Sequence, residues 1–514
     1  MSSEHRAPQS HELYRPIELT FEGADVIPAD RTPLTVRARH EASGAERVVP
    51  GFWDGGTTYR VRFAPDLEGT WSWTSDSTDA ALSGYAGTFR VGRGTDRGPV
   101  RVAHRFHFAH ADGTPFRPVG ATVYNWLHQD EPLFSSTVDA IAEAGFNKLR
   151  FMVFPQGGGY IEHVPTLMAF ERTTSETGDV RWDVTRPVPE FFQKLDRAVE
   201  VLGERGIQAD VLIYNAYDRG QFGLNELTEE EDAIYLRHLV ARLAAHPHVW
   251  WSLCNEFDQL ERPAERWDRT GALLAEVDPC DHLRSIHNWI ELYDNNQPWV
   301  THASIQNGAV TTDFGRANLY RDVYGKPVVL DEIKYEGDIP DRWGHLDAEQ
   351  LVHQFWISTV AGCYASHGES FVTASGSLHM VEGGPLRGDS PARLAFLRGI
   401  LEEVDGPGLD PIDKWDDPAY VAGIPRRLYV QYLGDAAPAT WDFRLPIGFP
   451  GERPEPGDRF AVDVIDTWNM TVTPVGRIFT LDDVQRNDAY DRASDPVALP
   501  EGEALALRIT RVED

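Results

Sequence analysis

The sequence predicts an α/β protein: a (β/α)8 barrel, or TIM barrel, flanked by an N-terminal and a C-terminal β-sandwich. Three observations support this architecture. Residues 1–98 hold short alternating segments typical of strands, residues 99–405 alternate apolar runs with amphipathic stretches, and residues 406–514 return to strand patterns. A chain of 514 residues is long enough for about two to four domains.

The N-terminal segment reads as a small Ig-like sandwich. Residues 34–39 (LTVRAR) and 59–63 (YRVRF) alternate between apolar and polar side chains, and residues 70–74 (TWSWT) are aromatic and β-branched. Such strands at about ten-residue spacing, with turn residues between them and no long helical pattern, are typical of a sandwich. The polar, Gly-rich residues 91–100 have no hydrophobic period. We therefore expect a linker there and a boundary after residue 98.

The middle segment contains eight apolar runs separated by helical patterns. The runs are FRPVGAT at 116, FNKLRFMVF at 146, IQADVLIY at 207, HVWWSLCNE at 248, LRSIHNW at 283, VTHASIQ at 300, PVVLDE at 327 and SFVTAS at 370. Phe192, Leu195, Val199 and Leu202 form one helical stripe, and Thr228 with Glu231 makes a capping box. Eight strands alternating with helices predict a closed (β/α)8 barrel, with extra residues in the loop 155–189. An open doubly wound sheet is the alternative, but no GxGxxG motif follows an early strand.

The C-terminal segment again has strand character. The runs are RLYVQYL at 427, TWDFRL at 440, FAVDVI at 460 and ALALRI at 504, and prolines and glycines separate them. A second sandwich packed on the barrel explains this pattern most simply.

Composition excludes several classes of function. The net charge of −32 makes nucleic acid an unsuitable partner, because phosphate binding needs clustered Lys and Arg. No apolar run is long enough to cross a bilayer, and the first residues lack the pattern of a signal peptide, so we expect a soluble, cytoplasmic protein that does not bind membranes. Cys254, Cys280 and Cys363 match no disulfide or zinc pattern and are expected to be reduced packing residues.

Two strand ends present a glutamate at the expected mouth of the barrel. The run VWWSLC ends in Asn255-Glu256, and PVVL ends in Asp331-Glu332. In such barrels the reactive groups project from the C-terminal ends of the strands, and the fourth and seventh strands face each other. Two carboxyl groups placed there can act on a glycosidic bond, with a separation of about 5–5.5 Å if the anomeric configuration is retained. A structural ion pair would give the same sequence pattern.

Further polar side chains at strand ends can complete this site. A cation near the nucleophile would keep it ionised, and amide or imidazole groups would hold sugar hydroxyls. The candidates for substrate binding are Arg150, Asn255, His287, Asn288 and Gln306.

The order Arg150, Asn255-Glu256, His287 and Glu332 on successive strands resembles the clan A glycoside hydrolases, which include the family 5 enzymes. The resemblance implies that Glu256 is the acid/base and Glu332 the nucleophile. Residues 51–77 (GFWDGGTTYRVRFAPDLEGTWSWTSDS) also resemble the small sandwich domain of unknown function found ahead of agarase-like glycosidase barrels.

The sequence departs from the clan pattern in its aromatic residues. The sixth run lacks the tyrosine that touches the nucleophile in clan members, and the eighth lacks the tryptophan that forms the sugar platform. We therefore expect Tyr124, Trp126 or Trp289 to supply the platform. Asp331 is a rival nucleophile, but side chains alternate along a strand, so only one of Asp331 and Glu332 should face the mouth. The clan pattern favours Glu332.

Together these observations predict a retaining glycosidase that acts from the chain end on oligosaccharides or small glycosides. Transglycosylation by the same residues and a non-catalytic carbohydrate-binding scaffold are the alternatives. The sequence has no HExxH cluster, so we expect neither a metal nor another cofactor. The expected partner is a carbohydrate, and a homo-oligomer is left open.

Overall fold

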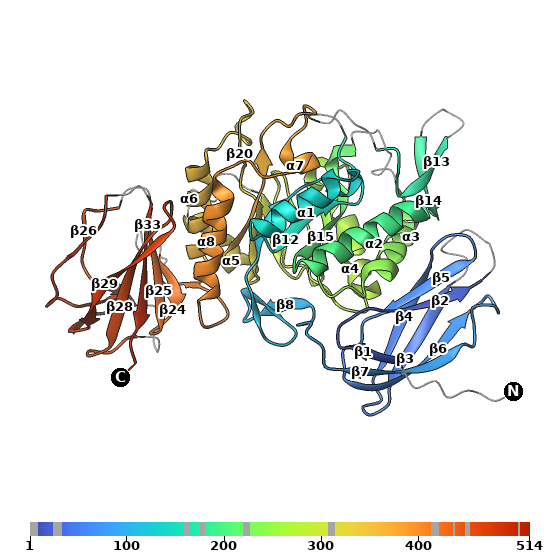
Figure 1. Ribbon diagram of the computed structural model, residues 1–514, viewed down its shortest axis with the longest axis horizontal. Coiled ribbons are helices and arrows are strands. Elements are labelled where there is room, and N and C mark those ends of the chain that lie inside the picture. The colour runs from blue at the N-terminus through green and yellow to red at the C-terminus, as the bar shows by residue number, and fades with distance from the viewer. Residues whose placement is uncertain are drawn as a thin grey trace.

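The chain forms three parts in a row, with the barrel in the middle and a strand-rich sandwich on each side of it (Figure 1). The computed structural model describes residues 9–513 except for 24–32, 158–159, 161–164, 175–179, 219–226, 307–313, 413–420, 435–436, 448–452 and 502–503. The predicted boundaries at 98/99 and 405/406 fall between the elements of adjacent parts.

The N-terminal sandwich is built from seven strands. They are β1 (Gln9–Glu12), β2 (Ile17–Glu22), β3 (Leu34–His40), β4 (Glu46–Trp53), β5 (Thr58–Phe63), β6 (Gly69–Ser77) and β7 (Ala86–Gly92), in the order β1-β7-β6-β3-β4-β5-β2. The first half of β4 pairs with β3 and the second half with β5, so the chain changes sheets near Gly51. A side chain at Gly51 would collide with Leu34, whose nearest atom would lie 2.8 Å from an added Cβ. Trp71, Val61 and Val36 lie in the core between the sheets.

A small sheet closes the lower end of the barrel. It contains β8 (Val100–Ala103), β9 (His107–His110) and β10 (Pro115–Phe116) in antiparallel register. Phe108 and Phe116 pack on Trp250 at the N-terminal ends of the barrel strands. This end of the barrel is therefore filled by aromatic side chains, and the opposite end is left for chemistry.

Eight parallel strands form the barrel wall. They are β11 (Val119–Thr122), β12 (Lys148–Met152), β15 (Gln208–Asn215), β16 (Val249–Asn255), β17 (Arg284–Ser285), β18 (Ala303–Gln306), β19 (Val328–Glu332) and β21 (Tyr364–His367). Neighbours in sequence pair with each other, β11 pairs with β21, and a bridge between His287 and Ser304 joins β17 to β18. The strands thus close into a ring, and the predicted barrel is confirmed.

The position predicted for the eighth barrel strand was wrong. The apolar run at 370 contributes only β22 (Glu369–Ser370), which pairs with β20 (Glu336–Gly337) outside the barrel. The true eighth strand, β21, is four residues long and carries small and polar side chains. Ser366 points into the charged barrel interior, where it donates to Asp331 (2.8 Å), so this strand needs no apolar run.

Helices cover the outside of the barrel. They are α1 (Leu133–Glu143), α2 (Pro189–Glu204), α3 (Glu229–Leu243), α4 (Ala264–Val277), α5 (Phe314–Tyr324), α6 (Ala348–Val360) and α8 (Ser390–Glu402), whereas the short α7 (His379–Glu382) lies beside Tyr124 at the mouth. Short 3-10 turns are η1 (Trp126–His128), η2 (Ala216–Asp218) and η4 (Phe257–Gln259). The predicted capping box at Thr228 and Glu231 is present at the start of α3, and the predicted stripe of α2 is buried. The expected insertion after β12 contains a hairpin of β13 (Phe170–Thr174) and β14 (Val180–Pro187).

The C-terminal part contains a six-stranded sheet in the order β23-β24-β25-β33-β28-β29 and smaller sheets beside it. Its strands are β23 (Asp410–Pro411), β24 (Val421–Ile424), β25 (Leu428–Gly434), β26 (Thr440–Trp441), β27 (Arg444–Pro446), β28 (Arg459–Asp466), β29 (Thr471–Thr480), β30 (Asp483–Val484), β31 (Asp488–Tyr490), β32 (Val497–Ala498) and β33 (Leu505–Arg511). Tyr432 of β25 stacks on Trp356 of α6 with ring centroids 5.6 Å apart. This contact joins the C-terminal sandwich to the outer layer of the barrel, at the left in Figure 1.

Buried charges join the N-terminal sandwich to the barrel. Arg62 on β5 lies 2.8 Å from Asp196 on α2 and donates to the carbonyl of Arg242 on α3 (2.9 Å). Arg242 in turn reaches back to Asp54 of the sandwich (2.6 Å). Each charge in this interface therefore has an opposite charge within hydrogen-bond distance, which buried ions require.

Two general predictions concern the thiols and the membrane. All three cysteines are free, as predicted, and Cys254 and Cys363 are buried. In the part of the chain that the structure describes, no helix has both the length and the apolar character that crossing a bilayer requires.

Candidate active site

Glu256 and Glu332 stand at the ends of the fourth and seventh strands of the ring, as predicted. Glu332 is the last residue of β19, and Glu256 follows β16 directly. The backbone of Glu256 is left-handed (φ 55°, ψ 53°), which is uncommon for a residue with a side chain and occurs preferentially at functional sites. Both carboxyl groups are more than nine-tenths buried. Two acidic groups in such a position need specific partners.

The partners of Glu332 favour its ionised form. The hydroxyl of Tyr124 donates to Glu332 Oε1, and Arg150 Nη1 lies 3.6 Å from the same oxygen. His287 Nδ1 lies 3.9 Å away, and burial keeps the pKa of this imidazole well below its usual value, so it is neutral. Burial is the larger effect and leaves the pKa of Glu332 above its usual value, while Arg150 and Tyr124 act in the opposite direction and limit the rise.

The surroundings of Glu256 favour its protonated form. Burial and the nearby charge of Glu332 raise the pKa of Glu256 to about 8. Gln259 donates to Glu256 Oε2, and Gln306, with its amide nitrogen turned toward the site, donates to Glu256 Oε1 (2.9 Å). A hydrogen bond from Tyr217 also reaches this carboxyl group. These are neutral donors, in contrast to the cation beside Glu332.

Arg150 connects the two halves of the site. Its Nη2 donates to Asn255 Oδ1 (2.8 Å), while Nη1 faces Glu332. The amide nitrogen of Asn255 is 3.3 Å from the hydroxyl of Tyr217. All of these side chains except Tyr217 are fully buried, so the arginine and the asparagine have fixed orientations. The predicted grouping of Arg150, Asn255, Glu256, His287 and Glu332 therefore exists in space.

Asp331 does not face the mouth of the barrel. Lys148 Nζ lies 2.7 Å from Asp331 Oδ1 and 2.6 Å from Asp210 Oδ2, all in the barrel interior. Ser304 donates to the other oxygen of Asp331 (2.6 Å). Burial acts to raise the pKa of Asp331, but Lys148 and Arg150 outweigh it and hold the pKa well below its usual range. The alternation along β19 thus gives Glu332 to the mouth and Asp331 to the interior, as the sequence predicted.

Two further predicted residues form a support behind Glu256. Asn288 Nδ2 donates to the carbonyl of Gln306 (3.1 Å), and the backbone N–H of Gln306 donates to Asn288 Oδ1 (3.2 Å). Gln306 in turn contacts Glu256. Both residues thereby belong to the surroundings of the acid, one directly and one through its neighbour.

The three aromatic candidates have different positions. Tyr124 is buried and contacts Glu332, so it fills the place that a tyrosine of the sixth run was expected to fill. The prediction for Trp126 was wrong: it is fully buried, stacks on Phe134 with ring centroids 4.6 Å apart and donates to a backbone carbonyl, so it offers no face to a sugar. Trp289 is 47% exposed beside the site.

The sequence analysis missed several residues of the site. Tyr217 follows β15, Gln259 lies in η4 and Tyr335 follows β19. Burial and the nearby carboxylate of Glu332 raise the pKa of the Tyr335 hydroxyl. Their position after strand ends was the available signal, but tyrosine and glutamine are common in loops, and nothing else in the sequence sets these three apart.

Among the described residues, one group could hold a metal ion by geometry. One ligand atom each of Glu336, His367 and Glu369 lies within 4.8 Å of the others, and all three side chains are buried. The carboxylates accept backbone N–H groups of residues 387–390, at the start of α8. The group therefore has a structural use in fixing this segment.

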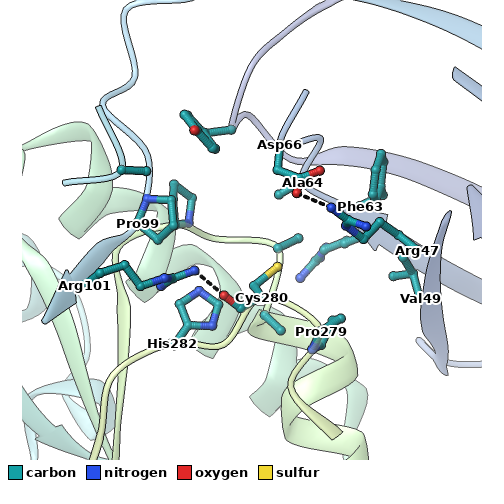
Figure 2. Close-up of a pocket in the computed structure, with 16 residues that line it drawn as sticks. Arg47, Val49, Phe63, Ala64, Asp66, Pro99, Arg101, Pro279, Cys280 and His282 are labelled. Atoms are coloured by element: carbon teal, nitrogen blue, oxygen red, sulfur yellow. Dashed lines mark hydrogen bonds and ion pairs between the residues drawn. The ribbon is translucent and has the colours of Figure 1, made fainter. Parts of the chain in front are cut away.

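A separate pocket of about 260 Å³ lies between the N-terminal sandwich and the barrel (Figure 2). Arg47 and Asp66 of the sandwich face Arg101 and Cys280 across it. Cys280 precedes β17, whereas His287 follows this strand. The pocket is thus at the opposite end of the strands from Glu256 and Glu332, and it is not the catalytic cleft.

A closed (β/α)8 barrel with two glutamates in different surroundings at its mouth is an arrangement typical of glycoside hydrolases. The family model "Apiosidase-like, catalytic domain" matches residues 103–371, more than half of the chain. The chain belongs to this apiosidase-like family and is a glycosidase, whose substrate is a carbohydrate. Models of two domains of unknown function, DUF5060 and DUF5605, match residues 10–78 and 415–510. A comparison with curated proteins found no match.

Solved structures agree with this assignment. A proposed glycoside hydrolase from Bacteroides vulgatus is 32% identical, with a TM-score of 0.92 over 98% of this chain and 100% of that one. A family 5 glycoside hydrolase from the same species (14% identity, TM-score 0.57, 80% and 93% covered) and a further glycoside hydrolase (12% identity, TM-score 0.56, 80% and 97% covered) share the fold. The predicted resemblance to glycoside hydrolase barrels is confirmed, and the segment expected to resemble a sandwich domain of unknown function matches such a domain.

Proposed function

We propose that the protein is a retaining glycosidase in which Glu332 is the nucleophile and Glu256 the acid/base. The observation that carries the proposal is the contrast between the two carboxyl groups. Glu332 has the cation Arg150 3.6 Å from one of its oxygens, whereas Glu256 has only neutral donors and a pKa of about 8. A nucleophile must be ionised and an acid protonated at the same pH, and this contrast provides both.

The reaction follows from these protonation states. Glu332 attacks the anomeric carbon while Glu256 gives its proton to the leaving oxygen, so the glycosidic bond breaks and a glycosyl ester forms. The ionised Glu256 then takes a proton from water, which attacks the same carbon and releases Glu332. Asn255 and the neutral His287 lie beside the reacting groups, where they can hold sugar hydroxyls. A sugar acceptor in place of water would give transglycosylation.

The family name suggests apiosides as the first substrates to test. We propose further that the enzyme removes a terminal sugar from oligosaccharides or small glycosides. The two sandwiches contact the outer helices α2, α3 and α6 and so give no evidence of a cleft closed at one end. Support for exo action must therefore come from products, and a time course that releases only monosaccharide would provide it.

A screen of nitrophenyl glycosides, including apiosides and both anomers of common pyranosides and furanosides, tests the activity. Glu332→Ala should lose turnover and regain it with azide, and the sugar released by the wild type should keep its anomeric configuration. Glu143→Ala, on an exposed residue of the outer helix α1, is the control and should stay active. Inverted product, or turnover in Glu332→Ala without azide, would contradict the mechanism. A carbohydrate-binding scaffold would show no turnover at all.

A further inference from the structure

Three large apolar side chains are exposed within four residues beside the site. Trp289, Ile290 and Leu292 are 47%, 71% and 40% exposed. We call these three residues the apolar ridge. Contiguous exposed apolar surface next to a polar cleft is typical of ligand-binding sites. Isolated exposed apolar residues are common on protein surfaces, but three within four residues indicate a surface that binds a ligand or partner.

The ridge belongs to a segment held firmly in place. Its flanks are buried, with His287 on one side and Tyr293, which packs on Phe257 (5.2 Å between ring centroids), on the other. Asp258 accepts the backbone N–H groups of Trp289 (2.5 Å), Ile290 (2.7 Å) and Glu291 (2.7 Å). Three charge-assisted hydrogen bonds to consecutive amides fix the backbone while the apolar side chains stay exposed.

Asp258 also ties the ridge to the acid. It lies two residues after Glu256, in the short turn η4, and Gln259 of the same turn donates to Glu256. The N–H of Phe257 donates to the carbonyl of His287 (3.0 Å), which joins the turn to the start of the ridge segment. The position of the ridge relative to Glu256 is thus set by short, direct contacts.

From this geometry we propose that the apolar ridge, with Trp289 at its centre, is the binding site for the leaving group, and that its occupant is a sugar ring. The inference rests on the proposed function. An acid that protonates the leaving oxygen must lie beside the leaving group, so a surface fixed to Glu256 contacts that group. An indole face suits the C–H face of a sugar ring, and Asp258 acts as a positioning residue.

Substrates with and without a sugar leaving group test the proposal. Trp289→Ala should lower kcat/KM by about tenfold or more for a disaccharide of the glycone found in the screen, because a stacking contact is lost. It should change turnover of the corresponding glycosyl fluoride, whose leaving group is one atom, by less than about twofold. Asp258→Asn should show the same selective loss, which a general defect in folding would not produce. Tyr85→Ala removes an aromatic side chain that is 50% exposed on the N-terminal sandwich and is the matched control.

Equal loss on both substrates, or no loss on either, would overturn the proposal. A fall in oligomeric state of Trp289→Ala, measured by light scattering, together with unchanged selectivity would also overturn it and would assign the ridge to contact between copies. These outcomes differ from failure of the proposed function, which would leave Glu332→Ala active on both substrates.

Discussion

At the level of single residues, the charge of Glu332 depends on the hydroxyl of Tyr124. We expect Tyr124→Phe to raise the pKa of Glu332, because it removes a donor to the ionised form. A nucleophile must be deprotonated, so the rise of kcat/KM with pH should move to higher pH by about one to two units, since a hydrogen bond to a charge contributes about 1.5–3 kcal/mol. Tyr364→Phe is the control, because this hydroxyl bonds His107 (2.8 Å) at the closed end of the barrel. Identical profiles for wild type and Tyr124→Phe would contradict the assignment.

Glu256 should set the opposite limb of the pH profile. Its pKa is about 8, and an acid works only when protonated, so kcat/KM should fall as pH rises through about 8. Glu256→Gln should remove this limb and lower kcat/KM by about 10²–10⁴-fold for substrates with a sugar leaving group. In dinitrophenyl glycosides the leaving dinitrophenolate needs no proton. Glu256→Gln should therefore lower kcat/KM much less for these substrates than for substrates with a sugar leaving group. A limb that persists in Glu256→Gln would assign the titration to another group.

The sequence predicted residues better when their position followed from strand periodicity. Glu256, Glu332 and Arg150 end buried strands, and the alternation along a strand decides which side they face. This approach failed for Trp126. An indole near a strand end can serve as a sugar platform or pack in the core, and only tertiary contacts distinguish these two roles. Tyr217 could not be ranked above other loop tyrosines, since its role depends on where Glu256 and Asn255 lie in space.

At the level of elements, the barrel strands enclose charges in place of a purely apolar interior. Lys148 of β12 lies between Asp210 of β15 and Asp331 of β19. Lys148→Met should lower the free energy of unfolding by about 3–5 kcal/mol, because it removes the nearest cation of two buried carboxylates and leaves them only Arg150, at 3.8 and 4.0 Å. The double variant Lys148→Met/Asp331→Asn should recover part of this loss, since one of the carboxylates becomes neutral.

Urea unfolding followed by tryptophan fluorescence measures the effect of Lys148→Met on the free energy of unfolding. Arg197→Ala is the control, because its ion pair with Glu131 has side chains 62% and 51% exposed, and exposed pairs contribute at most about 1 kcal/mol. Equal stability of Lys148→Met and Arg197→Ala would show that the interior charges do not stabilise the barrel.

These interior charges also explain which strands the sequence revealed. Seven barrel strands appear as apolar runs because they are buried on both faces. β21 is buried as well, but it faces Asp331 with Ser366, so its four residues carry no apolar signal. The nearby run at 370 was more apolar and was chosen in its place. Pairing with β11 and β19, which only the folded chain provides, identifies the true strand.

At the level of the whole molecule, the order of the three parts could be predicted because the hydrophobic pattern changes along the chain, from that of strands to that of alternating strands and helices and back again. How the parts dock could not, since Arg62 and Asp196 are 134 residues apart and neither side chain signals its partner. Localisation in the cytoplasm and the oligomeric state also stay predictions. Docking rests on contacts that can be tested one at a time.

Arg62 should control how firmly the N-terminal sandwich is held on the barrel. Arg62→Met removes the hydrogen bonds to Asp196 and to the carbonyl of Arg242, while Asp196 keeps Arg242 as a partner at 2.8 Å. We therefore expect looser docking without unfolding. Hydrogen bonds to charged groups contribute about 1.5–3 kcal/mol, so the sandwich should separate from the barrel about tenfold more often at the least.

Limited trypsin digestion reports this separation, because Arg93 and Arg97 are exposed in the segment between the sandwich and the barrel. Cleavage there should be faster in Arg62→Met than in the wild type by about tenfold at the least, in line with the population of the separated form. Activity should be unchanged, since the interface lies against the outer helices and not at the mouth. Arg37→Met breaks an ion pair with Glu46 whose side chains are 54% and 50% exposed, so it should leave the cleavage rate as it is. Equal rates in all three proteins would mean that the sandwich is held by its apolar contacts and not by Arg62.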